Sequence, residues 1–317
     1  MKKYQKPLII LITIVFMILI IANVSMKDVI NGLFSIGIGT FLLCLLIHFF
    51  VYLIRSITMS VFLKKEVPFF YLLISHLIHN FYLNIVPASM GELSLPLLLN
   101  KFVSKTRTFT VLLITRGFSF AMFCLLFLIS VFIIFGKYTL ININYKHLSL
   151  SLAALLVIYI LYLLLRKTNI VNKVFIVKIK EKLLKLKMSF VFSIKKELVF
   201  SRILSLSLLT LAYITFLALF FKVLLVKLNI SVSFIELYYI MSLQLAILVL
   251  PIKSFGGFGT TEGAWMIGLM SLGIDKKIAL ESGIIMHIIN LASAAIFFAL
   301  GLLAKYYYDK KLALSKI

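Results

Sequence analysis

The chain has 317 residues, of which 63% are hydrophobic and 14% are charged, and its mean hydropathy is +1.15. This composition excludes a soluble globular domain and predicts a polytopic α-helical membrane protein. The formal net charge of +23 would suggest nucleic-acid binding in a soluble protein. Here lysine and arginine cluster between apolar runs, as membrane-flanking residues do, so no nucleic-acid partner is expected. The two cysteines, Cys44 and Cys124, lie inside apolar stretches and indicate neither a disulfide framework nor a thiolate metal site.

The N-terminal lysines Lys2, Lys3 and Lys6 precede an apolar run that is long for a secretion signal and has no small-residue cleavage site after it. We therefore expect a retained first span. Apolar runs need ~20 residues to cross ~30 Å of hydrocarbon, and six runs in this chain qualify. They are 8–25, 33–54, 109–135, 148–165, 203–226 and 278–304.

Two further pairs of apolar segments flank breaks that contain proline and glycine. The first pair is 68–86 and 92–104, and the second is 232–250 and 261–273. Each pair is either two spans or one re-entrant hairpin, and periodicity does not decide between them. The expected fold is all-α: a single membrane domain over 1–317 with about six full spans and two broken hairpins, eight or more membrane segments in all.

Lysine and arginine are distributed unevenly between the two sides of the membrane. With the N-terminus inside, 23 of the 33 fall in cytoplasmic segments and 6 on the opposite side. This bias predicts a multi-pass protein of the cell (plasma) membrane with both termini in the cytoplasm. The cytoplasmic loop 166–202 carries 11 of these residues. It is interpreted as an interfacial helix on anionic lipid, with a docking site for a partner protein as the alternative.

The same topology relates two units of the chain by inversion. The unit 33–135 starts outside and takes its hairpin from the cytoplasmic side, whereas the unit 203–304 starts inside and takes its hairpin from the outer side. Inverted repeats with broken helices are the architecture of alternating-access carriers.

A motif repeats at the two breaks. Residues 87–92 read PASMGE and residues 251–262 read PIKSFGGFGTTE, so each break places a glutamate, Glu92 or Glu262, where the next helix should begin. A basic residue follows within the next apolar helix, Arg116 at 24 positions and His287 at 25. A carboxylate at membrane depth needs a partner, so we expect these four side chains to lie close together at the repeat interface. The alternative is that each glutamate only stabilises a helix start.

The glycines of these breaks are Gly91, Gly256, Gly257 and Gly259. Glycine permits positive φ and close backbone approach. The freed N–H groups at the two helix starts could then bind an anion such as a phosphate. The alternative is that these glycines only form tight turns.

A polar stripe occupies the helix predicted over 68–86. Its members, His76, His79, Asn80 and Asn84, share one helix face. Such a stripe is costly against lipid and is expected to face inward, for interior hydrogen bonding or for lining a cavity around a polar headgroup. A histidine pair without further ligands is weak evidence for a metal, so neither a metal site nor a cofactor is expected. Glu236 and Gln244 are weaker candidates for the same role in the other hairpin.

At these residues the sequence resembles the lysylphosphatidylglycerol synthase transmembrane-region family of flippase-like membrane proteins. The resemblance runs from about residue 10 to 305 and rests on the two break motifs with Arg116. It implies a role in translocating lipids or lipid-linked sugars, beside or fused to a lipid-modifying enzyme. The family usually has arginine where this chain has Leu95 and His287, which weakens the expectation of an anionic headgroup. The soluble aminoacyl-transfer domain of full synthases is not present before Ile317, so lysyl transfer by this chain itself is not expected.

The leading hypothesis is a lipid flippase or carrier, with Glu92, Arg116, Glu262 and His287 as its polar centre. Its substrate would be a phospholipid or another lipid-linked headgroup. The first alternative is a non-transporting scaffold that binds a glycosyltransferase or lipid-modifying synthase. The second is a membrane-embedded transferase acting on lipid-linked sugars. No catalytic motif supports an enzyme, and the sequence leaves the oligomeric state open.

Overall fold

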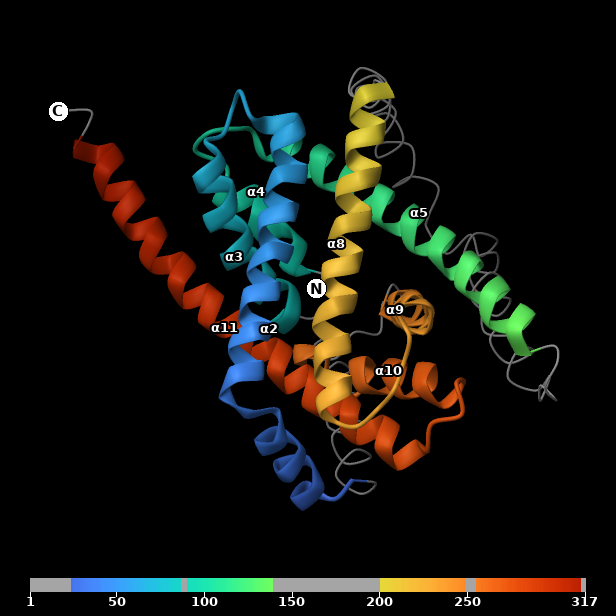
Figure 1. Cartoon of the computed structure of the whole chain (residues 1–317). Coiled ribbons are helices and arrows are strands. Elements are labelled where there is room, and N and C mark those ends of the chain that lie inside the picture. Colours follow the sequence, from blue (N-terminus) through green and yellow to red (C-terminus); the bar gives the residue numbers. More distant parts are fainter. Residues whose placement is uncertain (1–23, 87–89, 139–199, 249–254, 315–317) are drawn as a thin grey trace, which may run out of the picture. The chain divides into compact units, whose positions relative to one another are not determined.

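The computed structural model describes residues 24–86, 90–138, 200–248 and 255–314 (Figure 1). The chain forms two compact units. The first comprises Met1–Phe132 and Ile203–Ile317, and the second, Ile133–Arg202, is described only at its two ends. Within the described ranges every regular element is a helix, which confirms the all-α prediction. The elements are α2 (Met26–Leu63), α3 (Phe69–Ile85), η1 (Met90–Leu93), α4 (Ser94–Leu98), α5 (Lys105–Tyr138), α8 (Phe200–Lys227), α9 (Phe234–Leu248), η2 (Phe255–Gly257), α10 (Thr260–Met270) and α11 (Lys276–Leu314).

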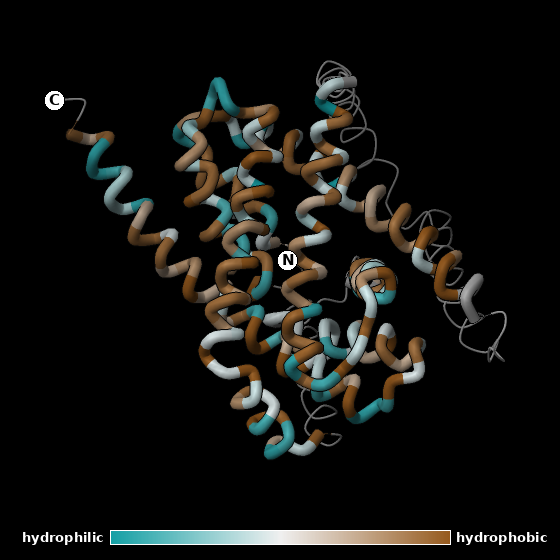
Figure 2. Tube along the Cα trace, in the orientation of Figure 1, coloured by the Kyte–Doolittle hydropathy of each residue, from teal (hydrophilic) through white to brown (hydrophobic). Residues whose placement is uncertain are grey.

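Four described helices, α2, α5, α8 and α11, are long and apolar enough to cross a membrane. They contain the predicted spans 33–54, 109–135, 203–226 and 278–304. The predicted spans 8–25 and 148–165, and most of the basic loop 166–202, lie outside the described residues. Figure 2 shows the four helices α2, α5, α8 and α11 as largely hydrophobic along their length. Many of their large apolar side chains are exposed, as expected of helices that face lipid.

Helix α2 is longer than its predicted span and is bent. Ser25 caps its start by accepting the N–H of Asp28 at 3.3 Å. Gly37 then departs from helical geometry, with φ 65° and ψ 158°, a conformation that is essentially restricted to glycine. The hydropathy pattern around 33–54 gave no sign of this bend.

The two arms of the first hairpin differ in structure. Helix α3 matches the predicted segment 68–86, whereas the segment 92–104 does not form one continuous helix, and only η1 and the five-residue α4 form there. Pro96 lacks an N–H and fits only the first turn of a new helix, which is where α4 places it.

The second hairpin follows its prediction more closely, as α9 and α10. Helix α10 has 11 residues. At 1.5 Å per residue it is roughly 16 Å long, about half of the ~30 Å of hydrocarbon.

The two halves of the chain pack into each other. Helix α11 contacts α2, α3 and α10, and η2 of the second hairpin also contacts α3 of the first. Tyr52, Leu73, Leu77 and Phe297 form a buried cluster that joins α2, α3 and α11. Gly301 lets α11 approach α3, since a Cβ there would lie 2.9 Å from Ile78. Polar groups of both hairpins are thereby held beside α11.

Candidate functional site

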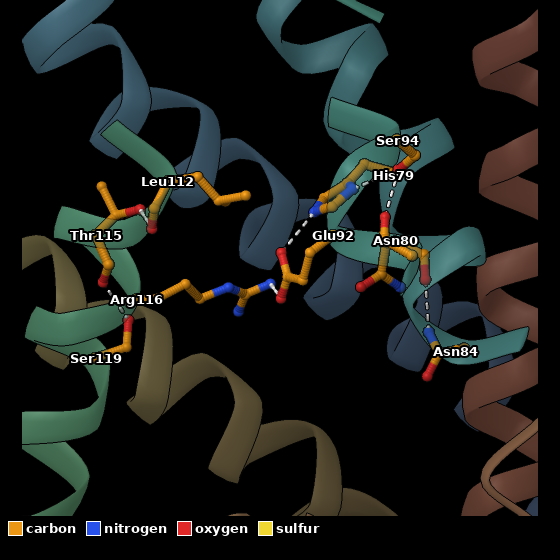
Figure 3. A network of polar contacts seen from close by, with 10 residues as sticks. His79, Asn80, Asn84, Glu92, Ser94, Leu112, Thr115, Arg116 and Ser119 are labelled. Carbon is orange, nitrogen blue, oxygen red and sulfur yellow. Dashed lines mark hydrogen bonds and ion pairs between the residues drawn. The ribbon is translucent and has the colours of Figure 1, made fainter. Parts of the chain in front are cut away.

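The first charged pair lies at the break of the first hairpin. Glu92 is in η1, and Arg116 reaches it from α5 with its Nη2 2.8 Å from Glu92 Oε1 (Figure 3). His79 Nε2 lies 3.6 Å from the other carboxylate oxygen, too far for a hydrogen bond. The Arg116 and Glu92 side chains are 34% and 28% exposed. This ion pair is therefore accessible to an incoming ligand.

The second charged pair lies at the break of the second hairpin and is enclosed. Glu262 stands in the first turn of α10, where its Oε2 accepts the N–H of Gly259 at 2.7 Å. Its Oε1 lies 2.6 Å from His287 Nδ1 on α11. The side chains are 1% and 3% exposed. An ionised carboxylate only accepts hydrogen bonds, so His287 donates through Nδ1 and its Nε2 is left for another partner.

The two pairs occupy corresponding positions in the two halves. Arg116 is the eleventh residue after Lys105, the first of α5, and His287 is the eleventh after Lys276, the first of α11. Each glutamate finds the basic partner that the spacing predicted.

A cavity of about 300 Å³ lies between the two halves. Glu92 and Arg116 line it from the first half and His287 lines it from the second, while Glu262 lies behind His287. The halves also touch at its wall, where Asn290 on α11 donates to Asn84 on α3 at 3.2 Å. Other polar residues lining it are His48, Tyr52, Arg55, Asn80, Tyr213, Gln244 and Thr261.

The polar stripe of α3 divides between two roles. His76 donates from Nδ1 to the Leu72 carbonyl at 2.9 Å, and His79 Nδ1 lies 2.7 Å from Ser94 Oγ, so both buried histidines make interior hydrogen bonds. They also line a smaller cavity of about 30 Å³. Asn80 and Asn84 line the larger cavity, and Figure 3 shows their side chains together with those of Glu92, Arg116 and His79.

Metal binding finds no support among the described residues, which bring together no three histidine, cysteine, aspartate or glutamate side chains. Glu236, a weaker candidate, accepts the Ser233 N–H at 2.6 Å and caps the start of α9 instead of lining the cavity. Gln244 does line it.

The break glycines have two different reasons for being glycine. Gly256, Gly257 and Gly259 adopt φ of 65°, 76° and 83°, as predicted. Gly91 does not have positive φ, so that part of the prediction is wrong; a Cβ there would lie 2.3 Å from the Tyr82 carbonyl oxygen, and close approach is what requires glycine.

The N–H groups available for the predicted anion site at the two helix starts are also fewer than expected. The N–H of Gly259 is already bonded to Glu262, and α4 with five residues is too short to present an N-terminal site. Gly257 remains at the cavity wall.

Sequence reasoning missed Arg55 on α2 and Tyr213 on α8. The Arg55 guanidinium lies 5.5 Å from the centre of the Tyr213 ring, and both residues line the cavity. A single arginine inside an apolar span is a signal that could have found the first of them.

Comparison with known proteins identifies the family. The family model described as "Lysylphosphatidylglycerol synthase TM region" matches residues 8–299, so the chain belongs to this family. No curated protein and no solved structure matches it.

Proposed function

We propose that this member of the lysylphosphatidylglycerol synthase transmembrane-region family is a flippase or carrier that moves a lipid or lipid-linked headgroup across the membrane. The observation that carries the proposal is the cavity of about 300 Å³ with charged and amide groups from both halves, inside helices whose outer surface is apolar. Its volume lies at the lower end of the ~300–1,000 Å³ of small-molecule sites. Family membership supports a lipid-related role.

The movement would follow alternating access. The short second arms, η1–α4 and α10, favour two re-entrant hairpins, and the corresponding places of Arg116 and His287 favour inverted units over 33–135 and 203–304. Rocking of such units about a fixed site opens it to each side in turn. With both termini in the cytoplasm, the first hairpin would enter from inside and the second from outside.

The two ion pairs would have different tasks. Glu92 and Arg116 are accessible, so a headgroup can replace either partner as it enters. Glu262 instead fixes the orientation of His287, which offers its second ring nitrogen to the cavity wall near Gly257. Gly91, Gly259, His76 and His79 act by holding the backbone and the α3 face in place, while Asn80, Asn84 and Gly257 surround the headgroup.

The test is headgroup translocation in reconstituted vesicles, measured as the loss of protection of an inner-leaflet fluorescent phospholipid from a membrane-impermeant quencher. Glu92→Gln and Arg116→Ala should each abolish protein-dependent translocation while the protein remains folded. Glu236→Gln is the matched control, because Glu236 caps α9 and does not line the cavity. Unchanged translocation in both cavity variants would defeat the proposal.

The alternative functions give different results. A scaffold for a glycosyltransferase or lipid-modifying synthase would depend on the basic loop 166–202 and tolerate both cavity variants. A transferase would turn over a labelled lipid-linked donor as the purified chain. We propose no catalytic role for the chain, and we propose a lipid-modifying enzyme as a partner beside it.

A further inference from the structure

Arg55 presents a charge to the cavity, and the carboxylate with which it interacts at longer range, Glu92, is already paired with Arg116. It stands on α2 eight residues before Leu63, and its guanidinium is held over the Tyr213 ring of α8. Within the described ranges it makes no hydrogen bond and no ion pair. It lines both the large cavity and the smaller one beside it. Its hydrogen-bond donors are therefore left for a ligand.

Arg116 is the second guanidinium on this wall and also lines both cavities. Its Nη2 is paired with Glu92, but its buried Nε has no hydrogen-bond partner among the described residues. Two arginines thus face one carboxylate, and Glu92 is the acidic member of the described lining. The wall carries an excess positive charge.

Such an excess is costly away from water, because a buried charge needs a partner to offset its desolvation. An anion between the two guanidiniums would supply that partner. Guanidinium is planar and presents paired donors that match the oxygens of a phosphate. The remaining lining includes the amides of Asn80, Asn84, Gln244 and Asn290, which can hydrogen-bond uncharged hydroxyls of a headgroup.

We propose that Arg55 and Arg116 together form a phosphate subsite, which binds the phosphate of a net negative headgroup more tightly than that of a zwitterionic one. This inference rests on the proposed carrier function and names its substrate class. The family usually has arginine at the positions of Leu95 and His287, and in this chain Arg55 supplies a permanent charge that those two residues do not.

The test measures binding to the purified full-length chain in detergent by isothermal titration. The probes are dihexanoyl phosphatidylglycerol, dihexanoyl phosphatidylcholine and inorganic phosphate. The wild type should bind the glycerol lipid more tightly than the choline lipid, and Arg55→Gln should weaken the former ten-fold or more. Arg107→Gln is the matched control, since Arg107 forms an ion pair with Glu66 and does not line the cavity. Unchanged affinity of Arg55→Gln for both anionic probes overturns the subsite.

The two anionic probes distinguish the source of the phosphate. Arg55-dependent binding of the glycerol lipid supports a lipid headgroup. Arg55-dependent binding of inorganic phosphate without binding of the lipid supports the subsite but overturns the lipid as its source.

A folding control separates binding from structure. Without ligand, Arg55→Gln should unfold at the same temperature as the wild type or higher, because removing a charge that makes no ion pair with the described residues offsets the loss of its contact with the Tyr213 ring. Arg55→Lys keeps the charge and should retain part of the binding. A lower unfolding temperature of Arg55→Gln together with wild-type affinity for the glycerol lipid shows a structural role and overturns the subsite.

The subsite and the carrier function fail separately. Arg55-dependent binding with no translocation in vesicles removes the carrier function and leaves the subsite. Translocation of phosphatidylglycerol by Arg55→Gln at the wild-type rate removes the subsite and leaves the carrier.

Discussion

The two ion pairs have similar chemistry but different burial, so breaking them should have very different effects on stability. His287→Ala leaves the Glu262 carboxylate almost completely buried, with the Gly259 N–H as its remaining bond. Removing one partner of such a buried pair costs about 3–5 kcal/mol. Arg116→Ala breaks a pair whose side chains are about a third exposed, 34% and 28%. For a pair so accessible to solvent the cost falls to roughly 0.2–1 kcal/mol.

The free energy of unfolding can be measured by titrating sodium dodecyl sulfate into mixed micelles and following helix content by circular dichroism. Glu262→Gln, His287→Gln and the double variant complete a cycle, in which the double variant should lose less than the sum of the single losses. Equal losses for His287→Ala and Arg116→Ala, or a loss below about 1 kcal/mol for the former, would refute the division into an enclosed structural pair and an accessible functional pair.

Four glycine substitutions, two of them controls, and one asparagine substitution test other parts of the structure by the same unfolding measurement or by the yield of folded protein. Gly37→Ala should cost about 1–3 kcal/mol, because its backbone conformation is essentially restricted to glycine, whereas Gly39→Ala, with open space at its Cβ position, should cost nothing. Gly91→Ala should lower the yield of folded protein sharply through its clash with a backbone carbonyl; Gly117→Ala, on an open helix face, should stabilise by about 0.5–1 kcal/mol, and equal yields would contradict this. Asn290→Leu should cost about 0.5–1.5 kcal/mol by removing a part-buried hydrogen bond between the halves, and no loss would show that this contact is not formed.

The pairing of the charged residues could be predicted because its cause is local and strong. A carboxylate between apolar segments needs a cation, and one basic residue stood at a similar distance after each of Glu92 and Glu262. The long helices followed equally well from hydropathy. The charged residues require neutralisation and the apolar helices require solvation by lipid, and both requirements follow directly from the residue types.

Other features depend on contacts that composition does not encode. The segment 92–104 is mostly apolar up to Leu99, but α4 ends at Leu98. Hydropathy reports the surroundings of a segment and not where the backbone turns. Gly91 looked like the other break glycines, yet its constraint comes from Tyr82 on the preceding helix. Arg55 follows the predicted span 33–54 and belongs to neither break motif, so the motif that revealed the other four residues gave no sign of it.

The most direct test of the central claim fills the cavity without changing its charge. Thr261 on α10 lines the cavity, whereas Ile267 on the same helix is 48% exposed on the apolar surface. In vesicles, the account predicts that Thr261→Trp stops headgroup translocation while Ile267→Trp translocates at the wild-type rate. Translocation by Thr261→Trp at the wild-type rate would contradict passage of the headgroup through this cavity.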